Sequence, residues 1–373
     1  MSTIITIGIT IIVVFLLFIL NKKGKQRSDY YLLLINVLLG SMLFTEYWIR
    51  VRITPINYFL HANLSFSLFS LYLLYALNLI DRKLKTQTPT WWVFIFTLPF
   101  ALYTLWDVLI LQPDTATLAK RYEAPGLIYH IFFKSHMLFV ILVGSWLLRH
   151  LQNFESKLKL QFSNIEDLRM YWLRNYTMIL MGLYGFSLVA FLIYNLGLVN
   201  DINAVYLVVN TVTVLAVFYL SFNGIKEYNL AQFIEAIHLI DQEANVKPPS
   251  AKYLSSKLAP KDIDKIYQRV EDLFQQEELH TEPQLKLAEV AKRLKVSSHH
   301  LSQAINSKFG HPFYEYVSHY RVQTLKGKLK DPKQQHLTIL ALALDAGFNS
   351  KASLNRIFKA HTGMTPSQYQ KAQ

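Results

Sequence analysis

The chain contains no cysteine and comparatively few charged residues. Without cysteine, neither a disulfide nor a Cys-ligated metal site can form anywhere in the 373 residues. Charged residues make up 17% of the sequence, below the usual value of about a quarter, while hydrophobic residues make up 52%. The sequence also lacks a phosphate-binding loop, the HExxH and GxSxG motifs and the kinase motifs. We therefore expect a protein that is not an enzyme, with no catalytic residues, no cofactor and no bound metal.

Long apolar runs occupy the first 224 residues, and each is long enough for a transmembrane helix of about 20 residues. The first run is followed rather than preceded by basic residues and lacks a small-residue cleavage site, so we interpret it as a retained span and not as a signal peptide. We expect a seven-helix transmembrane bundle over residues 1–224. Its spans are Ile4–Leu20, Tyr31–Trp48, Ile56–Leu79, Trp91–Leu111, Leu127–Leu148, Tyr176–Leu198 and Ala204–Phe222.

Basic residues in the connecting loops predict the orientation of these spans. The loops after the first, third and fifth spans hold 12 Lys and Arg residues, whereas the loops after the second, fourth and sixth hold 4. Loops rich in Lys and Arg stay in the cytoplasm. We therefore expect a multi-pass protein of a bacterial inner membrane, in contact with membrane lipid, with its N-terminus outside and the residues after Phe222 in the cytoplasm.

Polar side chains interrupt the spans, mostly toward their predicted outer ends. Such groups are costly in a membrane and often functional. One interpretation is an outward-facing pocket for an unknown signal ligand, and the other is that these groups pair with each other for packing alone. The candidate pocket residues are Glu46, His61, Asn63, Asp107, His130, Lys134, His136 and Asn195.

A helical linker is expected over residues 225–266. One amphipathic helix runs through Lys226–Ala244, a Pro-Pro sequence at residues 248–249 breaks it, and a second helix carries an apolar side that includes Ile266, Val270 and Phe274. These helices could join two copies of the chain as a homodimer, or they could pack onto the C-terminal domain.

The last 93 residues are strongly basic. Residues 281–373 hold 14 Lys and Arg against 5 Asp and Glu. Such a balance indicates a polyanionic partner, either nucleic acid or the anionic head groups of a membrane.

Two helix-turn-helix patterns occur in this basic region. In the first, Leu285–Leu294 precedes a turn and a second helix that starts after Ser297, a favourable N-cap residue. In the second, Ile339–Ala346 precedes a Gly347-Phe348 turn and the helix Ser350–His361. In helix-turn-helix units the second helix enters the major groove of DNA, so residues 267–373 are expected to hold two DNA-reading helices.

This region resembles the AraC/XylS family of DNA-binding domains. The strongest match is Ile339-x-x-Leu-Ala-x-x-x-Gly-Phe348, followed by Phe358, Gly363, Thr365, Pro366 and Tyr369. The resemblance implies a seven-helix bipartite domain that binds the double-stranded DNA of a promoter, and the multi-span N-terminal region resembles a membrane-bound bacterial subgroup of that family. The chain departs from the pattern at Lys295, where a turn glycine is usual, at Leu354, where Phe is common, and at Gly327 in the connecting helix.

The resemblance also assigns the positions that would contact bases. They are His299, His300, Ser302 and Gln303 in the first unit, and Lys351, Ser353, Asn355 and Arg356 in the second. Arg to guanine and Asn or Gln to adenine are good bidentate pairs. Contacts to phosphate alone are the alternative for each of these residues. Neighbouring histidines point to different faces of a helix, which makes His299 and His300 a poor metal pair.

The sequence therefore predicts an all-α protein in which a seven-helix transmembrane bundle is followed by a helical linker and a bipartite double helix-turn-helix domain. The expected function is a membrane-anchored transcription regulator that responds to a signal. Two alternatives stay open: a transporter or membrane enzyme with a DNA-binding regulatory tail, and a membrane protein that anchors DNA without regulating it.

Overall fold

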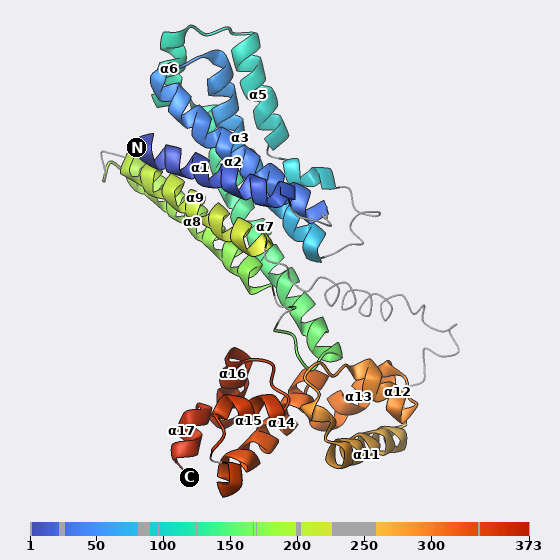
Figure 1. The fold of residues 1–373 in the computed structure, drawn as a ribbon. Coiled ribbons are helices and arrows are strands. Elements are labelled where there is room, and N and C mark those ends of the chain that lie inside the picture. The colour runs from blue at the N-terminus through green and yellow to red at the C-terminus, as the bar shows by residue number, and fades with distance from the viewer. Residues whose placement is uncertain are drawn as a thin grey trace. The chain divides into compact units, whose positions relative to one another are not determined.

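Figure 1 shows the computed structural model of the chain, which describes residues 2–21, 27–80, 90–95, 97–123, 126–166, 168, 170–198, 203–225, 259–334 and 336–372. Within these residues the regular secondary structure is helical, and the one isolated β-bridge joins Phe162 to Lys286. This agrees with the expected all-α fold. The chain divides into two compact units: unit 1 comprises Met1–Leu151 and Met170–Glu227, and unit 2 comprises Gln152–Arg169 and Tyr228–Gln373.

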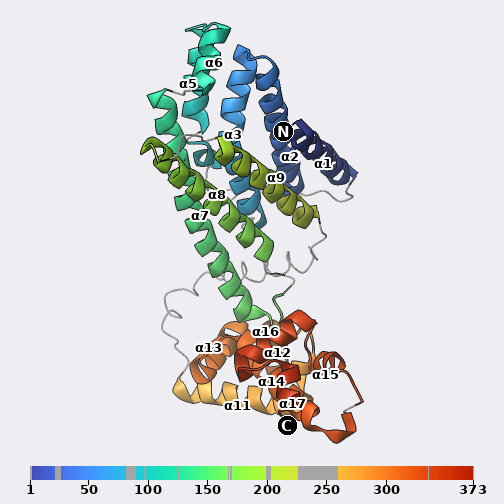
Figure 2. The ribbon, with the colours of Figure 1, turned by 90° about the vertical axis from the view of Figure 1, so that its left-hand side faces the viewer.

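Unit 1 contains the apolar helices. They are α1 (Ser2–Asn21), α2 (Arg27–Val51), α3 (Pro55–Ile80), η1 (Thr90–Phe94), α5 (Thr97–Leu109), α6 (Thr115–Glu123), α7 (Leu127–Gln161, the end of which belongs to unit 2), α8 (Tyr171–Asn195) and α9 (Asn203–Ile225). Helix α2 packs against α1, α3 and α9, and α9 lies beside α8 (Figure 2). Buried hydrogen bonds join neighbouring helices: Asn36 of α2 donates to Ser221 of α9 over 2.9 Å.

Four helices of unit 1 are long and apolar enough to cross a membrane. They are Ser28–Ile49, Pro55–Ile80, Leu127–Gln161 and Tyr171–Tyr194. They contain the second, third and fifth predicted spans and most of the sixth. The first and seventh predicted spans lie in α1 and α9, where the apolar segments Gly8–Asn21 and Thr211–Gly224 are shorter. The described residues therefore support four spanning helices, and the seven-span bundle stays a prediction.

The fourth predicted span is not one continuous helix. Trp91–Leu111 divides into the short turn η1 and the 13-residue helix α5. Pro99 lies in the first turn of α5, and a proline further inside a helix would remove a hydrogen bond and clash with the carbonyl four residues earlier. Thirteen helical residues extend about 20 Å, less than the roughly 30 Å of a bilayer core. The span was predicted from hydrophobicity alone, which takes no account of the proline at position 99.

Unit 2 is built around one central helix. Its helices are α11 (Pro260–Glu277), η2 (Leu279–Thr281), α12 (Leu287–Leu294), α13 (Ser298–Phe309), α14 (Phe313–Lys330), η3 (Pro332–Gln334), α15 (Ile339–Asp345), α16 (Lys351–Thr362) and α17 (Pro366–Lys371). Helix α14 packs against α13 of the first helix-turn-helix and against α15 and α16 of the second. It therefore joins the two halves of a bipartite domain.

The second linker helix belongs to this unit. Helix α11 packs against α13, and its Ile266, Val270 and Phe274 are buried in the core of the first helix-turn-helix. Of the two roles that the sequence left open for this helix, packing onto the C-terminal domain is the one observed. The first linker helix, Lys226–Ala244, lies outside the described residues.

Candidate nucleic-acid interface

The first helix-turn-helix consists of α12 and α13. The predicted inward residues of α12, Leu287, Val290, Ala291 and Leu294, are all buried. Lys295 ends α12 with a φ of 54°, a left-handed conformation that costs a residue other than glycine about 1–2 kcal/mol. The turn therefore forms without the usual glycine. Ser297 then starts α13 and accepts a hydrogen bond from the backbone amide of His300, as its N-cap role predicts.

The second helix-turn-helix consists of α15 and α16, and hydrogen-bonded side chains begin both helices. The Thr338 hydroxyl accepts from the backbone amide of Ala341, and the Ser350 hydroxyl accepts from that of Ser353. Gly347 lies in the turn with a φ of +91°, and Gly363 ends α16 in the left-handed conformation. Short-range interactions thus fix where the second reading helix starts and stops.

The predicted base-contacting residues of α13 are at least partly accessible. His299 is exposed, while His300, Ser302 and Gln303 are partly exposed. Asn306 is exposed four residues after Ser302 and donates a 3.3 Å hydrogen bond to its hydroxyl. The sequence interpretation did not include Asn306. The i,i+4 spacing of a helix, extended one turn from Ser302, would have found it.

Helix α16 presents a clearer polar face. Lys351 and Asn355 are exposed and one helical turn apart, and exposed Lys359 follows one turn later. The sequence interpretation omitted Lys359, although the same spacing indicates it. In the part of the chain that the structure describes, neither Lys351 nor Lys359 forms an ion pair. Their charges are therefore available to a polyanion.

Ser353 differs from the other predicted residues of α16. It is only 3% exposed. Its hydroxyl donates to the carbonyl of Ser350 over 2.9 Å and accepts from the Ser350 amide over 3.2 Å. The bond from the Ser350 amide, together with the bond from the Ser353 amide to the Ser350 hydroxyl, forms a capping box at the helix start. In this structure Ser353 has a structural role at the helix start and presents no hydroxyl on the exposed face.

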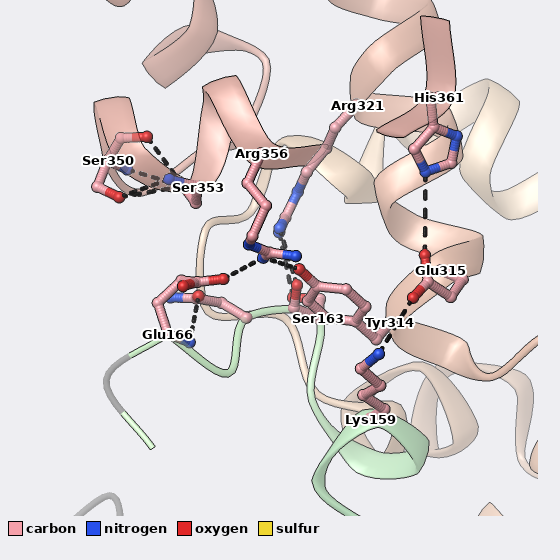
Figure 3. Close-up of polar contacts among 11 residues, drawn as sticks. Lys159, Ser163, Glu166, Tyr314, Glu315, Arg321, Ser350, Ser353, Arg356 and His361 are labelled. Carbon is pink, nitrogen blue, oxygen red and sulfur yellow. Dashed lines mark hydrogen bonds and ion pairs between the residues drawn. The ribbon is translucent and has the colours of Figure 1, made fainter. Parts of the chain in front are cut away.

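Arg356 is exposed but engaged. Its guanidinium forms an ion pair with Glu166 and donates a hydrogen bond to the hydroxyl of Tyr314 (Figure 3). Burial lowers the pKa of Arg356, but the hydrogen bond to Tyr314 and the charge of Glu166 raise that pKa by more, so the net shift is upward. The guanidinium is therefore a permanent cation whose partner in this state is an acidic residue of the same chain.

Buried Arg321 of α14 holds the Gln152–Arg169 segment in unit 2. Its side chain donates to the carbonyl of Ser163 over 3.0 Å, to the Ser163 hydroxyl over 3.1 Å, and to the carbonyls of His280 and Glu282 over 2.8 and 2.7 Å. Figure 3 shows Arg321 and Ser163 beside the Arg356 contacts. Burial lowers the pKa of Arg321 to about 10, which still leaves it charged at neutral pH. The sequence alone did not reveal these partners.

Four of the polar residues predicted to form a pocket in unit 1 form three pairs within one group of helices. His61 of α3 lies 3.5 Å from Glu46 of α2. Asn63 donates to Thr104 of α5 over 2.8 Å, and Asp107 forms an ion pair with Arg121 of α6. Glu46, Asn63 and Asp107 are buried. These pairs agree with the packing interpretation.

The other predicted pocket residues lie mainly along α7 and α8. The rings of His130 and Phe191 are 5.1 Å apart, and the Lys134 ammonium lies 4.5 Å from the centroid of the same Phe191 ring. His130 and Lys134 therefore share one face of α7, as their spacing predicts. His136 is buried against Phe66 of α3. Asn195 ends α8, but its side chain lies outside the described residues.

Comparison with known proteins identifies the second part of the chain. Residues 290–372 match the family described as the helix-turn-helix domain. An uncharacterized HTH-type transcriptional regulator of Staphylococcus aureus is 35% identical over 92 residues, which cover 25% of this chain and 12% of that protein. An HTH-type transcriptional regulator of Mycobacterium tuberculosis is 28% identical over 87 residues, covering 23% of this chain and 32% of its own length. The chain thus spans only a small share of these curated relatives.

Among solved structures, the C-terminal domain of the two-component response regulator yesN from Fusobacterium nucleatum is 26% identical, with a TM-score of 0.24, and the match covers 30% of this chain and 98% of that one. A Listeria innocua protein of unknown function is 28% identical with a TM-score of 0.25, and the match covers 28% of this chain and 94% of that one. The sequence matches assign the C-terminal region as an AraC-type helix-turn-helix domain, of the kind found in proteins named transcriptional regulators.

Proposed function

We propose that this chain, which carries an AraC-type helix-turn-helix domain at its C-terminus, is a sequence-specific transcription regulator anchored in a membrane. The observation that carries the DNA-binding part is the open polar face of α16, where Lys351, Asn355 and Lys359 repeat at one-turn intervals. An asparagine between two lysines suits an adenine edge flanked by phosphates. The basic balance of residues 281–373 supports the same partner.

Both reading helices have a part in this proposal. Helix α14 connects α13 and α16 as one packed element, an arrangement that would let the two helices occupy successive major grooves, about 34 Å apart along one DNA face. On α13 we assign contact with DNA to His299, His300, Ser302 and Gln303, and we add Asn306. On α16 we assign it to Lys351, Asn355, Arg356 and Lys359.

Replacing Asn355 tests whether α16 reads sequence. Asn355→Ala should weaken binding to the preferred duplex by about 1–3 kcal/mol and leave binding to scrambled DNA nearly unchanged. Lys359→Ala should instead weaken both by similar factors and reduce the salt dependence, because a phosphate contact carries no sequence information. Gln323→Ala, which removes an exposed amide from α14, serves as the control. Equal losses on both duplexes for Asn355→Ala would contradict base reading.

Exposed apolar faces support the membrane anchor. Leu138 and Leu142 of α7 and Val189 and Leu192 of α8 are each more than half exposed, at 51–61%, on helices long enough to span. Large exposed apolar surfaces are rare in soluble monomers and indicate contact with protein or lipid. The Gln152–Arg169 segment, between the fifth and sixth predicted spans, belongs to the same compact unit as the DNA-binding domain. Both must then lie on one side of the membrane, which agrees with the side that the basic residues predict.

Topology gives a separate test of the anchor. The protein should sediment with membranes and withstand extraction with carbonate. Protease added outside intact spheroplasts should leave a C-terminal epitope intact, and lysis should expose it to cleavage. A soluble protein, or an epitope cleaved in intact spheroplasts, would contradict the anchor or its orientation respectively.

We further propose that unit 1 senses a signal, through the polar groups at the predicted outer ends of its helices. The ion pair between buried Asp107 and partly exposed Arg121 is the best defined of these. Asp107→Asn keeps the size of the side chain and removes its charge. If expression of the target genes responds to the cell's conditions in the variant as it does in the wild type, this group has no part in sensing.

DNA anchoring without regulation is the alternative that shares all of these contacts. Mapping the DNA bound in cells separates the two, because a regulator should occupy discrete promoter sites, whereas an anchor should cover DNA without preference.

A further inference from the structure

We infer that the Gln152–Arg169 segment is an internal competitor for DNA, which holds Arg356 of the reading helix through Glu166 until DNA displaces it. This inference rests on the proposed function, since it assigns a regulator to the same helix. It follows from two features of unit 2. The segment is docked by specific polar contacts, and its Glu166 forms an ion pair with Arg356 of α16.

The segment is docked at its centre. Its Phe162 forms an antiparallel bridge with Lys286, and the Ser163 amide donates to the carbonyl of Leu285 over 3.0 Å. The buried guanidinium of Arg321 donates hydrogen bonds to both the carbonyl and the hydroxyl of Ser163. A buried arginine bonded to a main-chain carbonyl fixes the backbone as well as the side chain. The segment is therefore held in one register on unit 2.

This docking places Glu166 three residues beyond the Arg321 contact. The Glu166 amide donates to the Asn164 side chain over 3.1 Å, which turns the backbone locally. The Glu166 carboxylate then pairs with Arg356, whose guanidinium also bonds the Tyr314 hydroxyl. Figure 3 shows Glu166 and Tyr314 both close to the Arg356 guanidinium. The segment thus places the Glu166 carboxylate against Arg356 of α16.

A second ionic contact lies near the other end of the segment. Lys159 lies 3.5 Å from Glu315 of α14, and Glu315 in turn lies 3.9 Å from the His361 ring of α16. The Lys159 ammonium is also 5.6 Å from the centroid of the Tyr314 ring. The segment therefore contacts Arg356 of α16 directly through Glu166, and it is linked to His361 of α16 through Lys159 and Glu315.

DNA and Glu166 compete for the same hydrogen-bond donors of the Arg356 guanidinium. A guanidinium that pairs with a phosphate or with guanine must give its donors to an anionic or electron-rich acceptor. A carboxylate held at the same guanidinium competes for those donors and repels phosphate. Lys351, Asn355 and Lys359 stay open, so the segment removes one contact and does not block the helix. The expected effect is a graded change in affinity.

Chain continuity makes the competition adjustable. The segment begins within the last turns of α7 and is followed in sequence by α8, and both helices are long enough to cross a membrane. A change in either helix would be transmitted to Ser163 and Glu166 through the backbone itself.

The test uses the full-length protein in lipid nanodiscs and measures its affinity for a mapped operator duplex and for a scrambled duplex. Glu166→Gln keeps the shape of the side chain and removes its charge, and should tighten operator binding about 3- to 10-fold at low salt, the range of a partly exposed ion pair to arginine. The matched control is Asp272→Asn, since Asp272 is an acid of the same unit whose hydrogen bond is to Gln268 on its own helix. It should leave the affinity at the wild-type value.

A double-mutant cycle isolates the pair. In an Arg356→Ala background, Glu166→Gln should no longer tighten binding, because the cation that it released is gone. The inference would be overturned if Glu166→Gln raised operator affinity equally with and without Arg356, or if Glu166→Gln alone did not raise it. In either case a wild-type preference for the operator over scrambled DNA would leave the proposed function intact. Equal wild-type affinity for operator and scrambled DNA would instead overturn the proposed function, and the inference with it.

Discussion

Gly347→Ala should unfold unit 2 or come close to it. Gly347 has a φ of +91°, and a Cβ atom added there would lie 2.3 Å from the carbonyl oxygen of His280 and 2.9 Å from both the Arg321 Nε and the Thr281 Cα. Two of these three neighbours are backbone atoms and cannot rotate away. Strain from the left-handed backbone and the forced overlap together should cost about 3–5 kcal/mol. That is a large share of the stability of a domain of this size.

Gly310→Ala is the matched control. Gly310 also has a left-handed φ, +79°, but a Cβ atom there would meet nothing within 4 Å. The Gly310→Ala variant should lose only about 1 kcal/mol of its free energy of unfolding, the cost of a left-handed backbone at alanine. Pulse proteolysis in urea, followed through a C-terminal epitope on the full-length protein, measures both. Equal destabilisation of the two variants would show that the close approach to His280 does not matter.

Arg321→Met should also destabilise unit 2, by about 3–5 kcal/mol. The change keeps much of the side-chain length but leaves the buried carbonyls of His280 and Ser163, the part-buried carbonyl of Glu282 and the Ser163 hydroxyl without their donor. Each unsatisfied group costs about 1–3 kcal/mol, and the loss of the buried charge offsets part of this. The Gln152–Arg169 segment should become accessible to protease at lower urea concentrations than the rest of the unit, because Arg321 is its main polar contact.

Ser163→Ala provides the comparison for Arg321. It removes one of the acceptors and keeps the main-chain carbonyl that Arg321 also bonds, so it should cost only about 1 kcal/mol. An Arg321→Met variant as stable as the wild type would mean that the cost of burying the guanidinium cancels its hydrogen bonds. In that case Arg321 would not be what holds the segment.

The second helix-turn-helix was predictable from sequence because its signals are local. Thr338 and Ser350 cap helices that start one residue later, and Gly347 and Gly363 adopt the left-handed conformations that their positions require. Each of these interactions joins residues a few positions apart, so a single sequence displays both partners. Lys359 and Asn306 extend the predicted faces by the same spacing.

The contacts that join the Gln152–Arg169 segment to the rest of unit 2 were not predictable in this way. Glu166 and Arg356 are 190 residues apart, and Ser163 and Arg321 are 158 apart. Neither pair shares a helix or a repeating pattern, so composition and periodicity carry no information about them. The Gln152–Arg169 segment appeared in the sequence only as a basic loop between two apolar runs, and its place in unit 2 depends on tertiary packing.

Two local features of the structure were not visible in hydrophobicity or residue type. Trp91–Leu111 is apolar enough for a span, but its α-helix covers only Thr97–Leu109, with Pro99 in the first turn. Ser353 occupies a position assigned to base contact by resemblance, yet its hydroxyl pairs with Ser350. Both Ser350 and Ser353 are suitable capping residues in sequence, and only the geometry shows that they cap together.

Mapping the DNA protected by the full-length, membrane-bound protein across the genome tests the central claim most directly. The account predicts discrete protected sites in which two contacted segments lie about one helical turn of DNA apart, one for α13 and one for α16. It also predicts that Asn355→Ala loses these sites while keeping the protein in the membrane fraction. Uniform protection without preferred sites, or sites unchanged in Asn355→Ala, would contradict a membrane-anchored protein that reads DNA sequence through α16.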